Sequence, residues 1–188
     1  MANDSSTGGY LSPSSSPLEG QALVDFFQGW LVGITGLSGQ NVRPRWQPEP
    51  PNIPAATVDW MAFGITGREV QTNAAIVHFS GYDQLRRHET LTILMTIYGP
   101  NADATVSTLR EGLQIPQNLE PLQLQAMGLI DVGTAVVTSE LVKMQWIYRV
   151  DLEIKVRRQL VYTYPILDLL HADGTLTTDE QTTYQINV

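Results

Sequence analysis

Histidine is the residue type in this chain best suited to binding a metal or moving a proton near neutral pH, because imidazole titrates there. The sequence has three of them: His78, His88 and His171. The first lies within an expected strand, the second just before one, and the third beside an expected turn. None stands at the H-x-x-x-H or H-E-x-x-H spacing of a zinc site. His171 with Asp173 offers only a weak metal site, and a polar hairpin turn accounts for the same residues.

Other patterns that carry catalysis or phosphate binding are incomplete. Gly33, Gly36 and Gly39 match a phosphate loop in glycine content alone. The run lacks the G-K-[ST] ending, and it follows a helical pattern where a phosphate loop follows a strand. No G-x-S-x-G segment places a serine in a nucleophile elbow. Carboxylates such as Asp151 and Glu153 are expected on a solvated strand face, although two carboxylates in a cleft would suit acid–base catalysis. We expect no enzyme, and no catalytic, metal-binding or cofactor-binding residue.

The composition excludes further classes of protein. The chain has no cysteine, which excludes disulfides, thiolate zinc sites and cysteine nucleophiles and suits assembly in a reducing cytoplasm. Its first 17 residues lack the features of a secretory signal, and no apolar run approaches about 18 residues, so no membrane span is expected. The formal net charge is −8, so the chain as a whole should repel phosphate backbones.

The chain is expected to form one folded domain, residues 19–188, preceded by a flexible arm. Residues 1–18 are rich in Ser, Gly and Pro and have little to bury. From Gly20 to Ile34 apolar residues recur at helical spacing, and Gly36 follows the pattern. The apolar residues are Leu23, Phe27, Trp30, Leu31 and Ile34. A helix that packs one face on a sheet is the simplest interpretation.

A proline-rich segment, 43–54, comes next. Regular structure is not expected between Asn41 and Pro54, because proline lacks a backbone donor and fixes φ near the polyproline value. Such a segment is ordered only where it lies against its own domain or a neighbouring subunit. Its candidate anchor and interface residues are Arg43, Arg45, Trp46, Pro48, Pro50 and Pro51. A ligand for an SH3-type domain is the alternative interpretation.

Period-two alternation predicts three strands in the middle of the chain. Residues 57–65 and 69–80 are expected to pair as a hairpin around Gly64 and Gly67. Residues 89–98 alternate more clearly and predict a strand with one buried face. That face carries Leu91, Ile93, Met95 and Ile97.

Two helices are expected after these strands. Asn101 is a good N-cap, and Asp103 in the first turn favours the helix dipole. The buried face of this helix carries Ala102, Val106, Leu109 and Leu113. A shorter helix from Leu119 to Met127 is expected to end at Gly128, with another strand near residues 130–137.

A long alternation from Gln145 to Tyr164 is the most informative pattern. Even positions are mostly apolar, with Arg158 an exception, and odd positions are mostly charged. At about 3.3 Å per residue this strand would span on the order of 65 Å, whereas such a domain is about 35–40 Å across. It should therefore break at a bulge or extend past its core toward an oligomeric partner. The charged interface candidates are Arg149, Asp151, Glu153, Lys155 and Arg157. A hairpin, 164–188, turning at Ala172-Asp173-Gly174, should close the chain.

Six short strings occur in order between about residues 20 and 170. They are Arg45-Trp46-Gln47-Pro48-Glu49-Pro50-Pro51, Asp59-Trp60-Met61-Ala62-Phe63-Gly64-Ile65, Ile97-Tyr98-Gly99-Pro100-Asn101-Ala102, Leu109-Arg110-Glu111-Gly112-Leu113, Gln117-Asn118 and Trp146-Ile147-Tyr148-Arg149-Val150-Asp151. Each string alone is weak, but in register the set resembles the neck and tail terminator proteins of tailed phages.

The resemblance implies an α+β fold of the tail-terminator type: a twisted, mainly antiparallel β-sheet with two or three helices on one face. It further implies a structural virion protein that forms a hexameric ring. The ring would cap the tail tube protein and dock it to the neck or connector protein at the head–tail joint, after assembly in the host cytoplasm. Genomic DNA would pass through without specific binding. A head-completion or stopper protein, and a soluble adaptor module using the Pro/Trp segment, remain as alternatives.

Overall fold

The computed structural model describes residues 3–47, 49, 52–142, 144–168, 173–177 and 183–187. Its contacts divide the chain into two compact units. The larger unit comprises Pro17–Ala74 and Arg87–Leu160, and the smaller comprises Met1–Ser16, Ala75–Arg86 and Val161–Val188.

Seven strands form one open sheet: β1 (Val42–Pro44), β2 (Trp60–Val70), β3 (Ala75–Phe79), β4 (Tyr82–Tyr98), β5 (Met127–Val132), β6 (Val136–Val142) and β7 (Gln145–Tyr164). Their order is β1-β2-β4-β7-β5, with β3 paired to β4 and β6 paired to β7. β1 runs parallel to β2, whereas β2 and β3 run antiparallel to β4, and β5 and β6 antiparallel to β7. A separate two-stranded sheet consists of β8 (Asp173–Thr177) and β9 (Thr183–Asn187).

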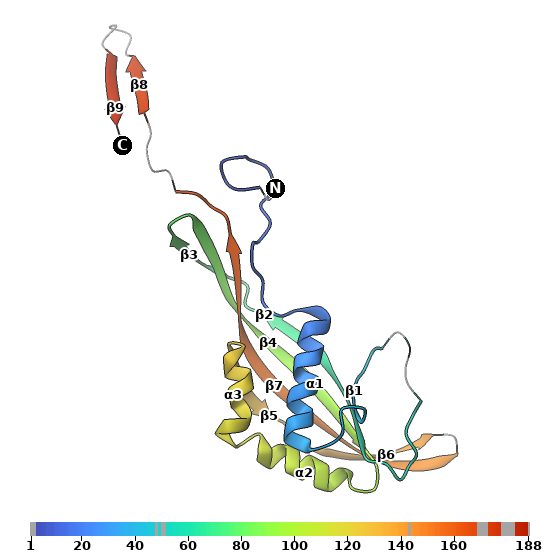
Figure 1. The fold of residues 1–188 in the computed structure, drawn as a ribbon. Helices are drawn as coiled ribbons and strands as arrows, with labels where there is room; N and C mark the ends of the chain where they lie inside the picture. Colours follow the sequence, from blue (N-terminus) through green and yellow to red (C-terminus); the bar gives the residue numbers. More distant parts are fainter. Residues whose placement is uncertain are drawn as a thin grey trace. The chain divides into compact units, whose positions relative to one another are not determined.

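Three helices lie on one face of the sheet: α1 (Gly20–Thr35), α2 (Ala102–Gly112) and α3 (Pro116–Leu124) (Figure 1). Helices on one face of a mainly antiparallel sheet confirm the α+β expectation. α1 begins and ends close to the predicted residues, and its predicted apolar face is buried except for the half-buried Ile34. Gly36 ends the helix in the left-handed region, at φ 71°, and its N–H donates to the Val32 carbonyl.

The two clearest alternating patterns were predicted correctly. The predicted face of β4 is buried, although this strand begins seven residues earlier than expected. β7 occupies the predicted range as one strand of 20 residues. Its core face is buried against the helices through Val150, Leu152, Ile154 and Val156.

The partners of β7 come from its own chain. Gln145–Asp151 pair with β6, Ile154–Arg158 pair with β5, and Thr163 bridges Ser15. The register shift in the β5 ladder lies in β5, between Leu129 and Asp131. The length of β7 alone therefore does not require a neighbouring subunit to pair with it.

The hairpin predicted around Gly64 and Gly67 is wrong. β2 runs through both glycines and pairs with β4, and β3 also pairs with β4. The ladder shifts register between Ile65 and Gly67, so one residue is bulged out and the strand continues. A glycine within an alternating pattern can mark a bulge or a close approach of another group as readily as a turn. The local sequence pattern does not distinguish these cases.

Three other expected element boundaries also need correction. Residues 42–44 form β1 at the edge of the sheet, where its closing residue Pro44 is tolerated. Met127 and Gly128 belong to β5, because α3 already ends at Leu124. The predicted strand 130–137 spans the end of β5 and the start of β6.

Two turn and cap assignments differ as well. Asn101 occupies the N-cap of α2, but its amide donates to the Asp59 carboxylate, and its side chain makes no cap hydrogen bond. Asp173 and Gly174 lie in β8, paired with Asn187 and Ile186, so they do not form the predicted turn. In both cases a contact distant in sequence takes the place of the local one.

Candidate assembly surface

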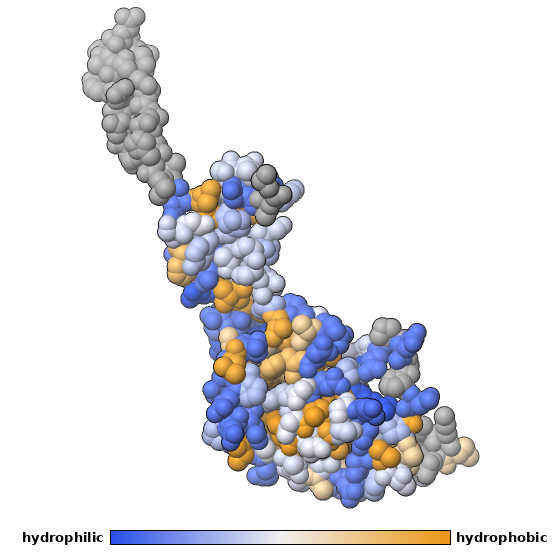
Figure 2. All heavy atoms as spheres, in the orientation of Figure 1, coloured by the Kyte–Doolittle hydropathy of each residue, from blue (hydrophilic) through white to orange (hydrophobic). Residues whose placement is uncertain are grey.

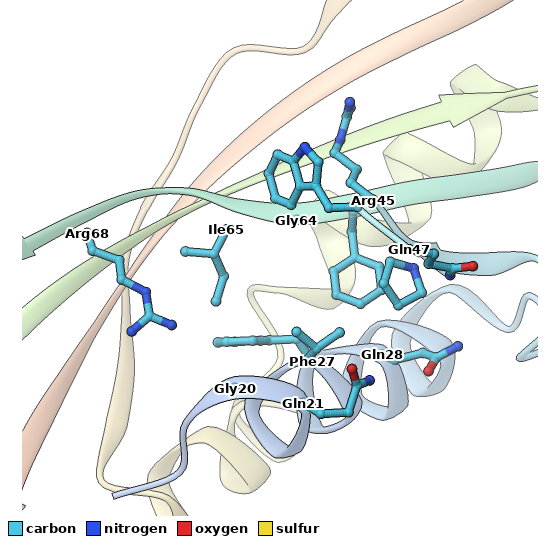
Figure 3. Close-up of a pocket in the computed structure, with 13 residues that line it drawn as sticks. Gly20, Gln21, Phe27, Gln28, Arg45, Gln47, Gly64, Ile65 and Arg68 are labelled. Atoms are coloured by element: carbon cyan, nitrogen blue, oxygen red, sulfur yellow. The ribbon is translucent and has the colours of Figure 1, made fainter. Parts of the chain in front are cut away.

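A hollow of about 490 Å³ lies beside β2, between α1 and the segment that follows β1 (Figure 3). Val24, Phe27, Phe63 and Ile65 give it an apolar lining. Its polar lining is Gln21, Gln28, Arg45, Gln47 and Arg68. An apolar lining with a few polar groups around it is typical of a binding site.

Trp46 lies against β2 at Gly64, and the fit depends on the absence of a side chain there. A Cβ on Gly64 would stand 2.6 Å from Cζ3 of the indole. The rest of the ring is open, because Trp46 is 73% exposed. Trp46 therefore touches its own domain and offers most of its surface to another molecule. Pro48, Pro50 and Pro51 lie outside the described residues.

The two arginines before Trp46 lie against β2 and β4. The Arg43 guanidinium stands 5.6 Å from the centroid of the Trp60 ring, which stacks on Tyr98 at 4.3 Å. Arg45 donates a hydrogen bond from its guanidinium to the Thr96 hydroxyl. Its Nε is buried and has no hydrogen-bond partner among the described residues. These contacts hold the segment's start on the sheet.

The five charged candidates on β7 share the side of that strand opposite its buried residues, because successive side chains alternate. Arg149 and Asp151 form an ion pair, with N and O atoms 2.8 Å apart. Glu153 and Arg157 are exposed, and Lys155 is half-buried. The five residues therefore lie on one face of β7 but do not form a catalytic or binding site.

Arg158, the charged exception on the apolar face of β7, organises a buried ion cluster that the sequence did not predict. Its Nε lies 2.6 Å from Glu89 Oε2, and its terminal nitrogens donate to Glu19 and to the Leu18 carbonyl. Arg68 also pairs with Glu19, at 2.8 Å. Burial raises the pKa of Glu19, but hydrogen bonds and charges from the two arginines outweigh this and leave the pKa below its usual value.

The hairpin of β6 and the start of β7 exposes several large apolar side chains. They are Val136, Val137, Leu141, Met144 and Trp146, each more than half exposed. Figure 2 shows apolar colouring at the end of the larger unit where Figure 1 places β6. The sequence pattern placed Trp146 among the apolar even positions of the long strand, and the structure leaves it 69% exposed. The hairpin lies beyond the helices, so its apolar face has no cover among the described residues.

The histidines do not form a metal site with other described residues. His78 Nδ1 lies 2.8 Å from Asp83 Oδ1, and His88 lines a hollow beside β5 together with Arg157 and Arg158. His171 lies outside the described residues. Among the residues that the structure describes, no group of three or more metal-ligating side chains gathers. None of the helices in this part of the chain is long and apolar enough to cross a membrane.

Comparison with known proteins gives a specific family. A family model described as phage neck terminator protein matches residues 21–180. This range includes both sides of the hollow and the whole β6–β7 hairpin. No curated protein matches the chain.

Proposed function

Because this chain belongs to the phage neck terminator protein family, we propose that it is a tail terminator that forms a six-membered ring. Membership makes it a structural protein of the phage neck and tail region, found in the virion. In the proposal, the ring caps the tail tube protein and docks it to the neck or connector protein. Genomic DNA passes through the ring, which assembles in the host cytoplasm.

The observation that carries the ring proposal is the exposed apolar hairpin of β6 and β7. A surface on which large apolar side chains gather is typical of a protein–protein contact. A head-to-tail ring of identical subunits needs two different surfaces on each subunit, one that projects and one that receives. The hairpin supplies the first kind of surface.

The charge of the chain supports passage of DNA without binding. Each chain carries −8, so six copies would carry about −48 around one channel, screened over roughly 8 Å at physiological salt. A duplex near an acidic wall is repelled and does not lodge there. The alternative is that the carboxylates only solvate the outer surface of the ring.

Particles that lack this protein test the proposal. A terminator stops tail growth, so its loss should give tails of abnormal length in electron micrographs of the lysate. A stopper on the head side retains DNA, so its loss would give heads that leak their genome beside tails of normal length. The second result would favour the stopper over the terminator. A chain that is dispensable for both would suit the adaptor alternative.

A further inference from the structure

We propose that neighbouring copies of this chain join edge to edge, with the β6–β7 hairpin of one copy seated along β2 and in the α1–β2 hollow of the next. This inference rests on the proposed ring and names the surfaces that would close it. Both surfaces belong to the larger unit. The two surfaces therefore lie in the same compact unit.

The projecting surface is an edge strand with exposed apolar side chains. β6 pairs with β7 through all seven of its residues, and among the described residues no strand pairs with its other side. Val137 and Leu141 are more than half exposed, and so are Met144 and Trp146 next to them. An unpaired edge with apolar side chains is a template for pairing with another chain.

The receiving surface is the second half of β2. The ladder between β1 and β2 covers only Met61–Phe63, and two further hydrogen bonds flank it, from the Met61 N–H to the Asn41 carbonyl and from the Arg45 N–H to the Phe63 carbonyl. β2 then continues for seven residues, Gly64–Val70, with no strand beside it on that side among the described residues. The hollow opens next to this stretch and offers the half-buried Val24 and Ile65 to apolar side chains (Figure 3).

The two surfaces match in length, chemistry and placement. The free stretch of β2 and the whole of β6 each have seven residues. Strand addition provides main-chain hydrogen bonds, and apolar side chains that enter a neighbouring hollow add specificity. In the strand order β2 and β6 are separated by β4 and β7, so they lie at opposite edges of one sheet. One copy cannot join its own two edges, and a contact of this kind propagates from copy to copy until it closes.

The polar lining of the hollow also suits an incoming strand. The lining of the hollow contains Arg45 and Arg68 and no carboxylate. The Arg45 guanidinium is bound to the Thr96 hydroxyl on the face of the sheet away from α1 (Figure 3), so Arg68 is the arginine that borders the hollow. Arg68 pairs with Glu19 but is partly exposed, so it can also donate to main-chain carbonyls of an incoming strand.

Disulfide trapping tests the contact, because the chain has no cysteine of its own. One cysteine is placed on the hollow, as Gln21→Cys or Gln47→Cys, and one on the hairpin, as Val137→Cys or Met144→Cys. The four double variants are assembled into particles, oxidised and run on a non-reducing gel. We expect at least one of these pairs to give a ladder of covalent multimers up to six copies, and each single variant to remain a monomer.

A matched control pair tests whether the ladder of multimers is specific to the proposed contact. Leu124→Cys with Met144→Cys keeps the hairpin cysteine and moves the other to the end of α3, where Leu124 is 84% exposed. This pair should stay monomeric. Every cysteine is shown to react with a maleimide in dissociated protein, so that a missing cross-link reports distance. Reactive pairs that never cross-link in assembled particles, or a hairpin cysteine trapped on a tube or connector protein instead, would overturn the inference.

The cross-linking experiment can fail without contradicting the proposed ring. If particles show a six-fold layer of this chain and the four pairs fail, the edge contact is wrong and the ring stands. If no such layer exists, the terminator proposal itself fails. A ladder that stops at two copies would indicate a dimer and contradict both.

Discussion

Arg158 Nε lies 2.6 Å from Glu89 Oε2 in the interior of the larger unit, where 1% of the arginine side chain and 3% of the glutamate side chain are exposed. The pair joins β7 to β4, and the same arginine reaches the residue that precedes α1 through Glu19. Arg158 therefore links the N-terminal end of α1 to the two central strands β4 and β7. A buried ion pair adds little net stability, but removing one partner leaves an uncompensated charge.

Arg158→Ala should therefore lower the free energy of unfolding by about 3–5 kcal/mol, because Glu89 would be left buried and unpaired. Chemical denaturation of purified protein measures this. Arg157→Ala is the matched control, since Arg157 is exposed on the same strand, and it should change stability by less than about 0.5 kcal/mol. Equal effects of the two substitutions would show that the buried cluster is unimportant.

Glu19 predicts a dependence of stability on pH. Its pKa is lowered in the folded chain from an ordinary value of 4.5. A lowered carboxyl pKa stabilises the folded state above the ordinary value, and this contribution is lost as pH falls through the folded pKa. Wild type and Glu19→Gln should therefore differ most near neutral pH and converge below pH 4.5. Denaturation midpoints across that range test it, and a difference that grows on acidification would contradict the sign.

Gly64 and Trp46 should behave as a coupled pair. Gly64→Ala places a Cβ where the indole lies, so the ring or the strand must move. Trp46→Ala alone should cost less than about 1 kcal/mol of stability, because only about a quarter of the residue is buried, yet it should clearly reduce tail joining. In a double-mutant cycle, Gly64→Ala should be milder when Trp46 is already alanine. Additive effects would mean that the two residues do not restrict each other.

The acidic composition predicts that the unmodified protein binds duplex DNA negligibly at physiological salt. Electrophoretic mobility or fluorescence anisotropy with a random-sequence duplex measures the affinity. Tight binding there would refute an acidic channel, and the carboxylates would then belong to the outer surface. In particles, lumen-facing carboxylates changed to lysine should slow genome ejection while tail assembly continues, whereas normal ejection kinetics would remove the repulsion argument.

Local periodicity was sufficient to predict α1, the buried face of β4 and the extent of β7, because each has a long repeat of apolar residues, broken in β7 only by Arg158 on its apolar face. It failed at Gly64 and Gly67, where the signal depends on a tryptophan 18 positions away and on a register shift against β4. It also failed to predict the role of Arg158. A single charge on an apolar face suggests a buried partner, but Glu89 and Glu19 lie 69 and 139 positions away.

The candidate assembly surface was likewise predictable from the sequence only in part. Arg43, Arg45 and Trp46 were identified from composition; Arg45 and Trp46 line the hollow, and Arg43 lies over the Trp60 ring on the sheet. The β6–β7 hairpin was not identified, because apolar alternation in β6 and β7 looks the same whether or not a helix covers it. Only the positions of α1, α2 and α3 show which apolar residues remain exposed.

The most direct measurement is a cryo-electron microscopy map of the virion neck, refined without imposed symmetry, into which the larger unit of this chain is fitted. We expect six copies in one layer between the connector and the first ring of the tail tube, with β6 of each copy against β2 of the next. This chain in a layer of another symmetry, or on the capsid side of the connector, would contradict the terminator proposal.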